Sequence, residues 1–243
     1  MKLSTNFLKD YIDIDVDVKQ LAEDMTRVGN EYDSASNLIN ATKLVIGQIT
    51  ECEPHPDSDH LHLCKVNIGT EVLDIVCGAP NARTGLKVIV ALDGAVLPEK
   101  TIKKGMIRGQ ESNGMLCSIA ELGLEHKFLK PEDSEGIAEL GEDAEIGGDP
   151  IKYLQMDDGV IDFELTANRG DLLSILGMAY EVGAIYDKKV KDVDLKHKES
   201  GEDINKTFKT EVKTANCSKL LVKKVENVKI EESPISVSYT HLR

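Results

Sequence analysis

The chain has 243 residues and a mass of 26.7 kDa, which is enough for one large domain or two small ones around a buried core. Its formal net charge is −14, whereas proteins that coat nucleic acids are generally basic, so any nucleic-acid contact must use a local patch. The sequence has no apolar run long enough for a membrane span and no secretory signal, so we expect a cytoplasmic protein with five reduced cysteines.

The first predicted elements are two short helices within residues 1–39. Asp17 followed by Gln20 has the form of a capping box, which marks the start of the second helix. Three apolar residues of this helix are predicted to share one face: Leu21, Met25 and Val28. Two such helices bury too little surface to fold alone, so they must pack against a later part of the chain.

Residues 40–149 change to short apolar runs that Gly, Pro and Asn interrupt, among them LVIGQIT, LHLCKVNIG, VLDIVCG and LKVIVAL. This pattern predicts a small β-barrel or sandwich, and the length suits one small barrel. The block is acidic as a whole, yet residues 83–130 carry 8 basic and 5 acidic groups. We therefore expect a locally positive surface within it.

Residues 150–187 return to a mixed α/β pattern. A strand is predicted where apolar and acidic residues alternate: Ile161, Asp162, Phe163, Glu164 and Leu165. A helix then follows, with Asp171 as its expected N-cap. The simplest architecture joins residues 1–39 and 150–187 into one small α/β domain, with residues 40–149 inserted as the barrel.

The last part of the chain has a different composition. Residues 188–209 are rich in Lys, Asp and Glu with little apolar content, which indicates a charged linker. Residues 210–230 are typical of the opening strands of another domain. A strand pair without the rest of its sheet buries little surface, so we expect this segment to be largely unstable alone.

Three motifs carry a family resemblance: VCGAPNARTG at 76–85, IKKGMIRGQESNGMLCS at 102–118 and SEGIAEL at 134–140. Together they resemble the tRNA-binding OB-fold domain that several tRNA synthetases share with free-standing tRNA-binding proteins. The flanks, MKLSTNFLKDYIDID at the N-terminus and ELTANRGDLLS at 164–174, make the chain similar to bacterial phenylalanine–tRNA ligase beta subunits. This resemblance extends from residue 1 to about residue 234.

The resemblance implies an α+β multidomain fold. A five-stranded OB-fold β-barrel at residues 40–149 would be inserted into a small α/β domain formed by residues 1–39 and 150–187. Residues 210–243 would be the truncated start of an editing domain. Their tail departs from the family from Ile235 onward.

The same resemblance implies a function. The chain would be the N-terminal part of a beta subunit, giving auxiliary tRNA contact and a scaffold for the alpha subunit in an α2β2 enzyme. That enzyme attaches phenylalanine to tRNA(Phe) with ATP and Mg²⁺, whereas this part is expected to bind no cofactor or metal and to catalyse nothing alone. The expected partners are tRNA(Phe) and the alpha subunit, and neither DNA nor a membrane.

Two alternatives remain open at this point. A free-standing protein that binds tRNA or structured RNA without enzymatic activity would use the same barrel, but it would lack both flanks. A protein–protein adaptor that no longer binds RNA would be consistent with the acidity of the chain.

A basic stretch is the main candidate for nucleic-acid contact: Lys100, Lys103, Lys104 and Arg108. Phosphates attract closely spaced cations and release counterions when these bind. The alternative is a solvated hairpin that uses Lys to protect an edge strand. Polar residues of the motifs complete the predicted tRNA-binding set: Asn81, Arg83, Ser112, Asn113 and Ser118. Their hydroxyl and amide groups can contact bases and ribose, or they can satisfy local turns.

Residues 40–150 contain a single aromatic residue, Phe128, so stacking on bases is not expected there. Contact through tRNA shape and backbone is the remaining mode, and it is weak and sensitive to salt.

Other chemistry-bearing residues have structural interpretations. Cys and His side chains gather at Cys52, His55, His60, His62 and Cys64, but their spacing matches no common closed zinc site. Cys77 and Cys117 lack a nearby His in their motifs, which favours core packing over nucleophilic chemistry. Arg169 could bind a phosphate or pair with Asp171, although a structural role as part of a helix cap with an interdomain salt bridge is favoured.

Overall fold

The structure is a computed structural model that describes residues 1–124, 135–192, 194, 196 and 201–230. The chain forms two compact units, Met1–Lys191 and Asp192–Ser233. Phe128 and the tail from Ile235 lie outside the described residues, as do Ser134 of the third motif and part of the predicted linker.

One part of the first unit is a three-stranded antiparallel sheet in the order β1-β10-β2. Its strands are β1 (Lys2–Ser4), β2 (Tyr32–Asn37) and β10 (Gly159–Phe163). Strand β10 therefore pairs with two strands from the start of the chain, and Leu3 lies opposite Ile161. The strand predicted around Ile161 is confirmed up to Phe163, whereas Leu165 lies beyond its end.

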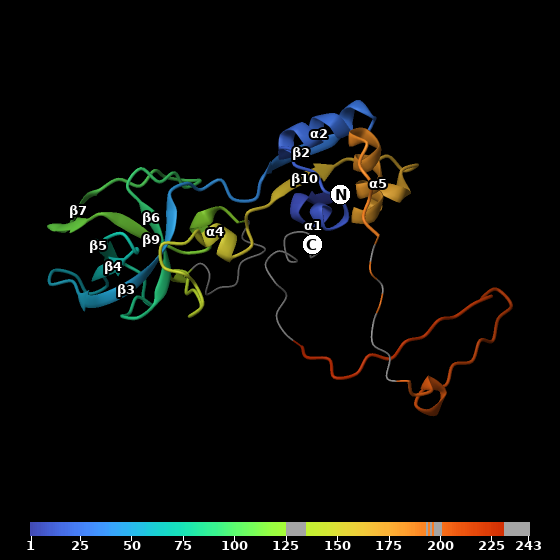
Figure 1. Cartoon of the computed structure of the whole chain (residues 1–243). Coiled ribbons are helices and arrows are strands. Elements are labelled where there is room, and N and C mark those ends of the chain that lie inside the picture. The colour runs from blue at the N-terminus through green and yellow to red at the C-terminus, as the bar shows by residue number, and fades with distance from the viewer. Residues whose placement is uncertain (125–134, 193, 195, 197–200, 231–243) are drawn as a thin grey trace. The chain divides into compact units, whose positions relative to one another are not determined.

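Helices of the same unit lie beside this sheet (Figure 1), and their apolar residues join those of the strands in one buried cluster. The helices are α1 (Thr5–Tyr11), α2 (Val18–Arg27) and α5 (Ile175–Tyr186), with the 3-10 helix η3 (Gly170–Leu173) before α5. Asp17 caps α2, because its Oδ1 accepts hydrogen bonds from the N–H groups of Lys19 (2.9 Å) and Gln20 (3.4 Å). The predicted cap is thus confirmed.

Two local expectations in this unit are wrong, and one strand was not predicted. Val28 is the C-cap of α2 and is 49% exposed, because the helix ends one residue before it. Asp171 lies within η3, and Ser174 caps α5 by accepting a hydrogen bond from the N–H of Gly177 at 3.0 Å. Residues 32–37 form β2, for which the sequence analysis predicted no element, because their polar side chains give no strand pattern.

A curled five-stranded antiparallel sheet occupies residues 44–117, in the order β5-β4-β3-β6-β9. Its strands are β3 (Leu44–Pro54), β4 (His62–Asn67), β5 (Val72–Cys77), β6 (Lys87–Leu92) and β9 (Gly114–Cys117). The chain is thus a mixed α/β protein with an antiparallel sheet where short strands are predicted.

Both faces of this sheet are covered. Along β6, Val88 and Val90 belong to one buried cluster, while Ile89 and Ala91 belong to another on the opposite face. This explains the continuous apolar run of that strand. Leu122, in the 3-10 helix η1 (Ala120–Leu122), adds to the second cluster near the short helix α4 (Pro150–Tyr153).

A small hairpin projects between β6 and β9. It consists of β7 (Gly105–Ile107) and β8 (Gln110–Ser112), joined by Arg108 and Gly109. Both turn residues have positive φ, 46° and 80°, as a two-residue hairpin turn of type I′ requires. All three residues of β7 are exposed.

The second unit, Asp192–Ser233, contains one short 3-10 helix, η4 (Ile204–Lys206), among its described residues. The strands predicted for residues 210–230 do not form there. Apolar side chains of this segment are exposed instead, with Leu221 at 77% and Ile230 at 94%. No helix in the described parts of the chain is long and apolar enough to cross a bilayer.

Candidate nucleic-acid interface

The connection from β6 to β8 positions the predicted basic residues. A turn at residues 97–100 is closed by two backbone hydrogen bonds between Leu97 and Lys100, and an isolated bridge joins Val96 to Thr101. Further along, the N–H of Lys104 donates to Asp93 Oδ1 at 2.9 Å, which fixes the backbone before the β7–β8 hairpin. The four cations are therefore carried on backbone that has local hydrogen bonds.

Lys103 and Lys104 are the most available cations of this stretch. Both are exposed, and neither Nζ has an ion-pair partner within the described ranges. Lys100 differs, because its Nζ donates to Glu121 Oε1 at 2.7 Å. An anionic ligand can thus contact Lys103 and Lys104 without breaking an existing pair, whereas it must compete with Glu121 for Lys100.

Arg108 lies at the tip of the β7–β8 hairpin. Its Nη1 donates to the carbonyl oxygen of Asp57 at 3.0 Å, which joins this tip to the turn between β3 and β4. The preceding residues Met106 and Ile107 are 67% and 41% exposed. The sequence analysis missed these two apolar residues, although Gly109, which follows them, is a turn signal because Gly readily adopts positive φ.

Two predicted hydroxyl groups are used by the fold. Ser112 is 4% exposed; its Oγ accepts from the N–H of Val76 and donates to the carbonyl of Gly114, both at 3.1 Å. Ser118 is 7% exposed and shares hydrogen bonds with Glu121 at the start of η1. These two side chains correspond to the structural interpretation of the motif and leave no group for a ligand.

Asn113 lies beside Ser112 but is only half-buried. Its backbone N–H donates to the carbonyl of Asp74 on β5 at 2.8 Å, which links the outer strand β5 to the residue that precedes β9. Its side-chain amide makes no hydrogen bond to the described residues. The amide therefore stays available for a polar ligand.

Asn81 and Arg83 form a separate group that is bound to the segment around Ile137. The Asn81 side chain exchanges hydrogen bonds with the backbone of Ile137 at 2.9 and 3.0 Å. Arg83 makes a bidentate pair with Glu139, with distances of 2.7 and 2.6 Å. These hydrogen bonds raise the pKa of Arg83 and lower that of Glu139, so both groups stay charged and paired.

Arg169 is also paired within its unit. Its guanidinium donates to Glu181 at 2.9 Å, to Asp171 at 3.0 Å and to Asn30 at 3.1 Å. The pair with Asp171 and the pair with Glu181 lower the pKa of both carboxyls. This network ties α5 to Asn30, which follows α2. The role is structural, as favoured from the sequence, but the salt-bridge partners Asp171 and Glu181 lie in the same unit as Arg169.

The Cys and His residues of the β3–β4 hairpin do not gather around one point. Among the described residues, no three side chains of His, Cys, Asp or Glu form a group that could hold a metal ion. His55 is buried and its Nδ1 accepts from the N–H of Asp57 at 3.0 Å. Cys77 and Cys117 are buried, and burial raises the pKa of both thiols, that of Cys117 to about 12, as in core packing.

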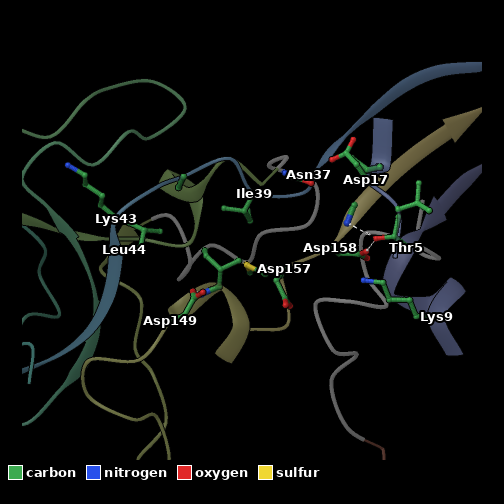
Figure 2. Close-up of a pocket in the computed structure, with 16 residues that line it drawn as sticks. Thr5, Lys9, Asp17, Asn37, Ile39, Lys43, Leu44, Asp149, Asp157 and Asp158 are labelled. Carbon is green, nitrogen blue, oxygen red and sulfur yellow. Dashed lines mark hydrogen bonds between the residues drawn. The ribbon is translucent and has the colours of Figure 1, made fainter. Parts of the chain in front are cut away.

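A cavity of about 470 Å³ in the first unit has an acidic lining. Figure 2 shows four carboxylates, from Asp17, Asp149, Asp157 and Asp158, with Lys9 and Lys43 at its sides. Asp158 accepts a hydrogen bond from Thr5 Oγ1 at 2.9 Å and another from the N–H of Asn6 at 2.9 Å. Because carboxylates outnumber cations, this cavity is unsuited to a phosphate backbone.

Comparisons with known proteins agree with the location of the sheet. Residues 44–149 match the family model described as "Putative tRNA binding domain". The chain is 43% identical over 240 residues to the "Phenylalanine--tRNA ligase beta subunit" of Lactobacillus johnsonii, covering 97% of this chain and 30% of that protein. It is 42% identical over 236 residues to the protein of the same name from Streptococcus pneumoniae, covering 96% of this chain and 29% of that protein.

A third relative of the same name, from Lactiplantibacillus plantarum, is 47% identical over 192 residues, covering 78% of this chain and 24% of that protein. The chain thus spans 24–30% of the length of these relatives. Over the residues that it spans, the chain belongs to the phenylalanine–tRNA ligase beta subunit family.

Proposed function

We propose that the chain contributes auxiliary tRNA binding and scaffolding to the ATP-dependent attachment of phenylalanine to tRNA(Phe). The observation that carries this proposal is the match of residues 44–149 to a tRNA-binding family within a chain related to ligase beta subunits. Relatives with this name cover both flanks of the sheet as well, which disfavours a free-standing RNA-binding protein.

The sheet of residues 44–117 would then belong to an OB-fold barrel at residues 40–149. It would be inserted into an α/β domain made of residues 1–39 and 150–187, and the pairing of β10 with β1 and β2 supports this. Residues 188–209 would link this part to residues 210–243, the start of an editing domain. Strands there would form only with further segments of the sheet, in accord with the exposed apolar residues such as Leu221.

The proposed contact surface consists of Lys103, Lys104, Arg108 and Asn113, which we call the hairpin surface. Its lysines carry unpaired charge, and Asn113 offers an amide beside the same hairpin. Lys100, Arg83 and Asn81 would contribute only after exchange of their present partners. Such a surface binds phosphates and shape rather than individual bases.

The whole enzyme would be an α2β2 assembly in which the alpha subunit carries the adenylation site. ATP and Mg²⁺ would bind there and in beta-subunit segments outside this chain. Among the described residues, no three side chains of His, Cys, Asp or Glu are grouped as a metal site. We assign this chain no catalytic step of its own and expect the pure chain to form no phenylalanyl adenylate.

Binding of the chain to tRNA(Phe) at two salt concentrations tests this proposal. The variant Lys103→Glu/Lys104→Glu should bind more weakly, and the slope of log affinity against log salt should fall by about two. Lys188→Glu/Lys189→Glu is the matched control, because it changes two adjacent exposed lysines elsewhere in the first unit. Equal affinity of the two double variants for tRNA(Phe), or no binding by the unmodified chain at low salt, would overturn the proposal that the hairpin surface contacts tRNA.

A further inference from the structure

Two cysteines face each other across the β3–β4 ladder. Cys52 is the register partner of Cys64, and the Cys64 thiol donates to Cys52 Sγ at 3.8 Å. Opposed residues of antiparallel strands have Cα atoms about 4.5–5.5 Å apart, and disulfides span about 4.4–6.8 Å between Cα atoms. The backbone thus holds this pair at a spacing that a disulfide can bridge.

The other cysteines are poorly placed to form a disulfide with Cys52 or Cys64. Cys77 is opposite His62 on the next strand pair, so it lies diagonally from Cys64. Diagonal neighbours are about 7–8 Å apart, whereas a disulfide needs Cβ atoms within roughly 3.5–4.5 Å. Cys117 pairs with Ile89 on the far side of β3, and Cys217 belongs to the second unit.

The two thiols differ in access to solvent. Cys52 is half-buried, whereas Cys64 is 2% exposed. Burial, followed by the neighbouring Cys52 sulfur, raises the pKa of Cys64 well above its ordinary value. A dissolved oxidant therefore reaches Cys52 first, and Cys64 can react once Cys52 carries a leaving group at this short distance.

We propose that Cys52 and Cys64 form a reversible cross-strand disulfide by exchange with a low-molecular-weight disulfide such as glutathione disulfide. The Cys52 thiol loses its proton to solvent, and its sulfur attacks the reagent disulfide, which releases one glutathione thiolate. The Cys64 thiol then loses its proton and attacks Cys52 Sγ, which releases the second glutathione. Two protein thiols are oxidised, one glutathione disulfide is reduced to two glutathione molecules, and the released thiolates take up the two protons.

The cross-link would join the two strands of the β3–β4 hairpin, whose turn accepts a hydrogen bond from Arg108. The Asp57 carbonyl that binds Arg108 lies between the two cysteines in sequence. Oxidation would therefore restrict the motion of the β3–β4 turn. It would also restrict the hydrogen bond by which this turn binds Arg108 of the β7–β8 hairpin. Exchange is reversible, because a glutathione thiolate can attack the Cys52–Cys64 disulfide and restore both thiols by the same two steps in reverse.

Peptide mapping tests the proposal directly on the full chain. Lys43 and Lys65 bound the tryptic peptide 44–65, which contains both cysteines and no internal Lys or Arg. After incubation with glutathione disulfide and alkylation, this peptide should escape alkylation and weigh two hydrogen atoms less, and dithiothreitol should restore it. Cys52→Ser should abolish this change, whereas the matched control Cys217→Ser should leave it intact.

Three results would overturn the proposal. One is alkylation of both cysteines in peptide 44–65 under conditions that oxidise Cys217. Another is a link between peptide 44–65 and peptide 66–83, which contains Cys77. The third is a stable mixed disulfide between glutathione and Cys52 from which Cys64 does not displace the glutathione. The mapping of the unmodified chain decides the question even where Cys52→Ser fails to fold, and a circular dichroism spectrum identifies that case.

Discussion

Removal of the Asp158 carboxylate should weaken the attachment of the N-terminal residues 4–6 to the segment that begins strand β10. Asp158 is 3% exposed and accepts hydrogen bonds from Ser4 Oγ, from Thr5 Oγ1 and from the N–H of Asn6. Ser4 is itself the N-cap of α1 and is 1% exposed. Asp158→Ala leaves these donors without their acceptor in a buried setting, next to a helix start.

The expected loss follows from these three contacts. A hydrogen bond to a charged group contributes about 1.5–3 kcal/mol, and the contributions of one carboxylate are not additive. We therefore expect the free energy of unfolding to fall by about 3–5 kcal/mol for Asp158→Ala. For a chain of this size, that corresponds to a decrease in Tm of roughly 6–20 °C. Asp158→Asn keeps one acceptor oxygen and should lose less.

Urea unfolding followed by circular dichroism measures the change. Asp157→Ala is the matched control, because Asp157 is the exposed neighbour whose side chain makes no hydrogen bond to the described residues. Its backbone carbonyl, which accepts from Asn6 Nδ2 at 3.1 Å, is kept in that variant. A loss for Asp158→Ala within about 1 kcal/mol of the control would refute the reasoning.

Two further predictions concern packing and pH. Gly47→Ala should destabilise the chain by about 1–3 kcal/mol in urea unfolding, because its Cβ would lie 2.7 Å from methyl groups of Val66 and Val90. Gly105→Ala, where nothing lies within 4 Å, is the control, and equal effects would contradict the clash. Tyr186 donates to Asp24 Oδ2 at 2.6 Å and is the main cause of the lowered pKa of Asp24. That stabilisation is present above the ordinary pKa of 3.8 and is lost as pH falls through the lowered value. The stability difference between Tyr186→Phe and the unmodified chain should therefore shrink in acid; a difference that stays constant down to pH 2 would contradict this.

Local signals in the sequence predicted some elements well. Asp17 marked the start of α2 because an N-cap is satisfied by its own neighbours, within three residues. The apolar run of β6 indicated a strand but not that alternate residues enter two different clusters. Strand β2 escaped prediction because its polar sequence YDSASN has no apolar alternation, and its pairing partner β10 is distant in sequence.

The sequence indicates which residue types could form the candidate interface, but not which of their side chains are already bound to other residues in the fold. Lys100 and Lys103 are the same residue type three positions apart, yet one is bound to Glu121 and the other has no partner within the described ranges. Ser112 fits an RNA-contact motif as well as a turn, and only its burial distinguishes the two roles. Such differences depend on residues that folding brings near, which spacing along the chain does not reveal.

One hydrogen bond has a consequence for how this fold could be rearranged. The N–H of Leu38 donates to the carbonyl of Asp158 at 2.8 Å, so the two ends of the stretch 39–157 are adjacent. The entropy of closing a loop rises only with the logarithm of its length, so a long excursion between neighbouring points costs little more than a short one. We therefore expect the sheet β1-β10-β2 to keep its own hydrogen bonds when residues 39–157 are exchanged, shortened or replaced.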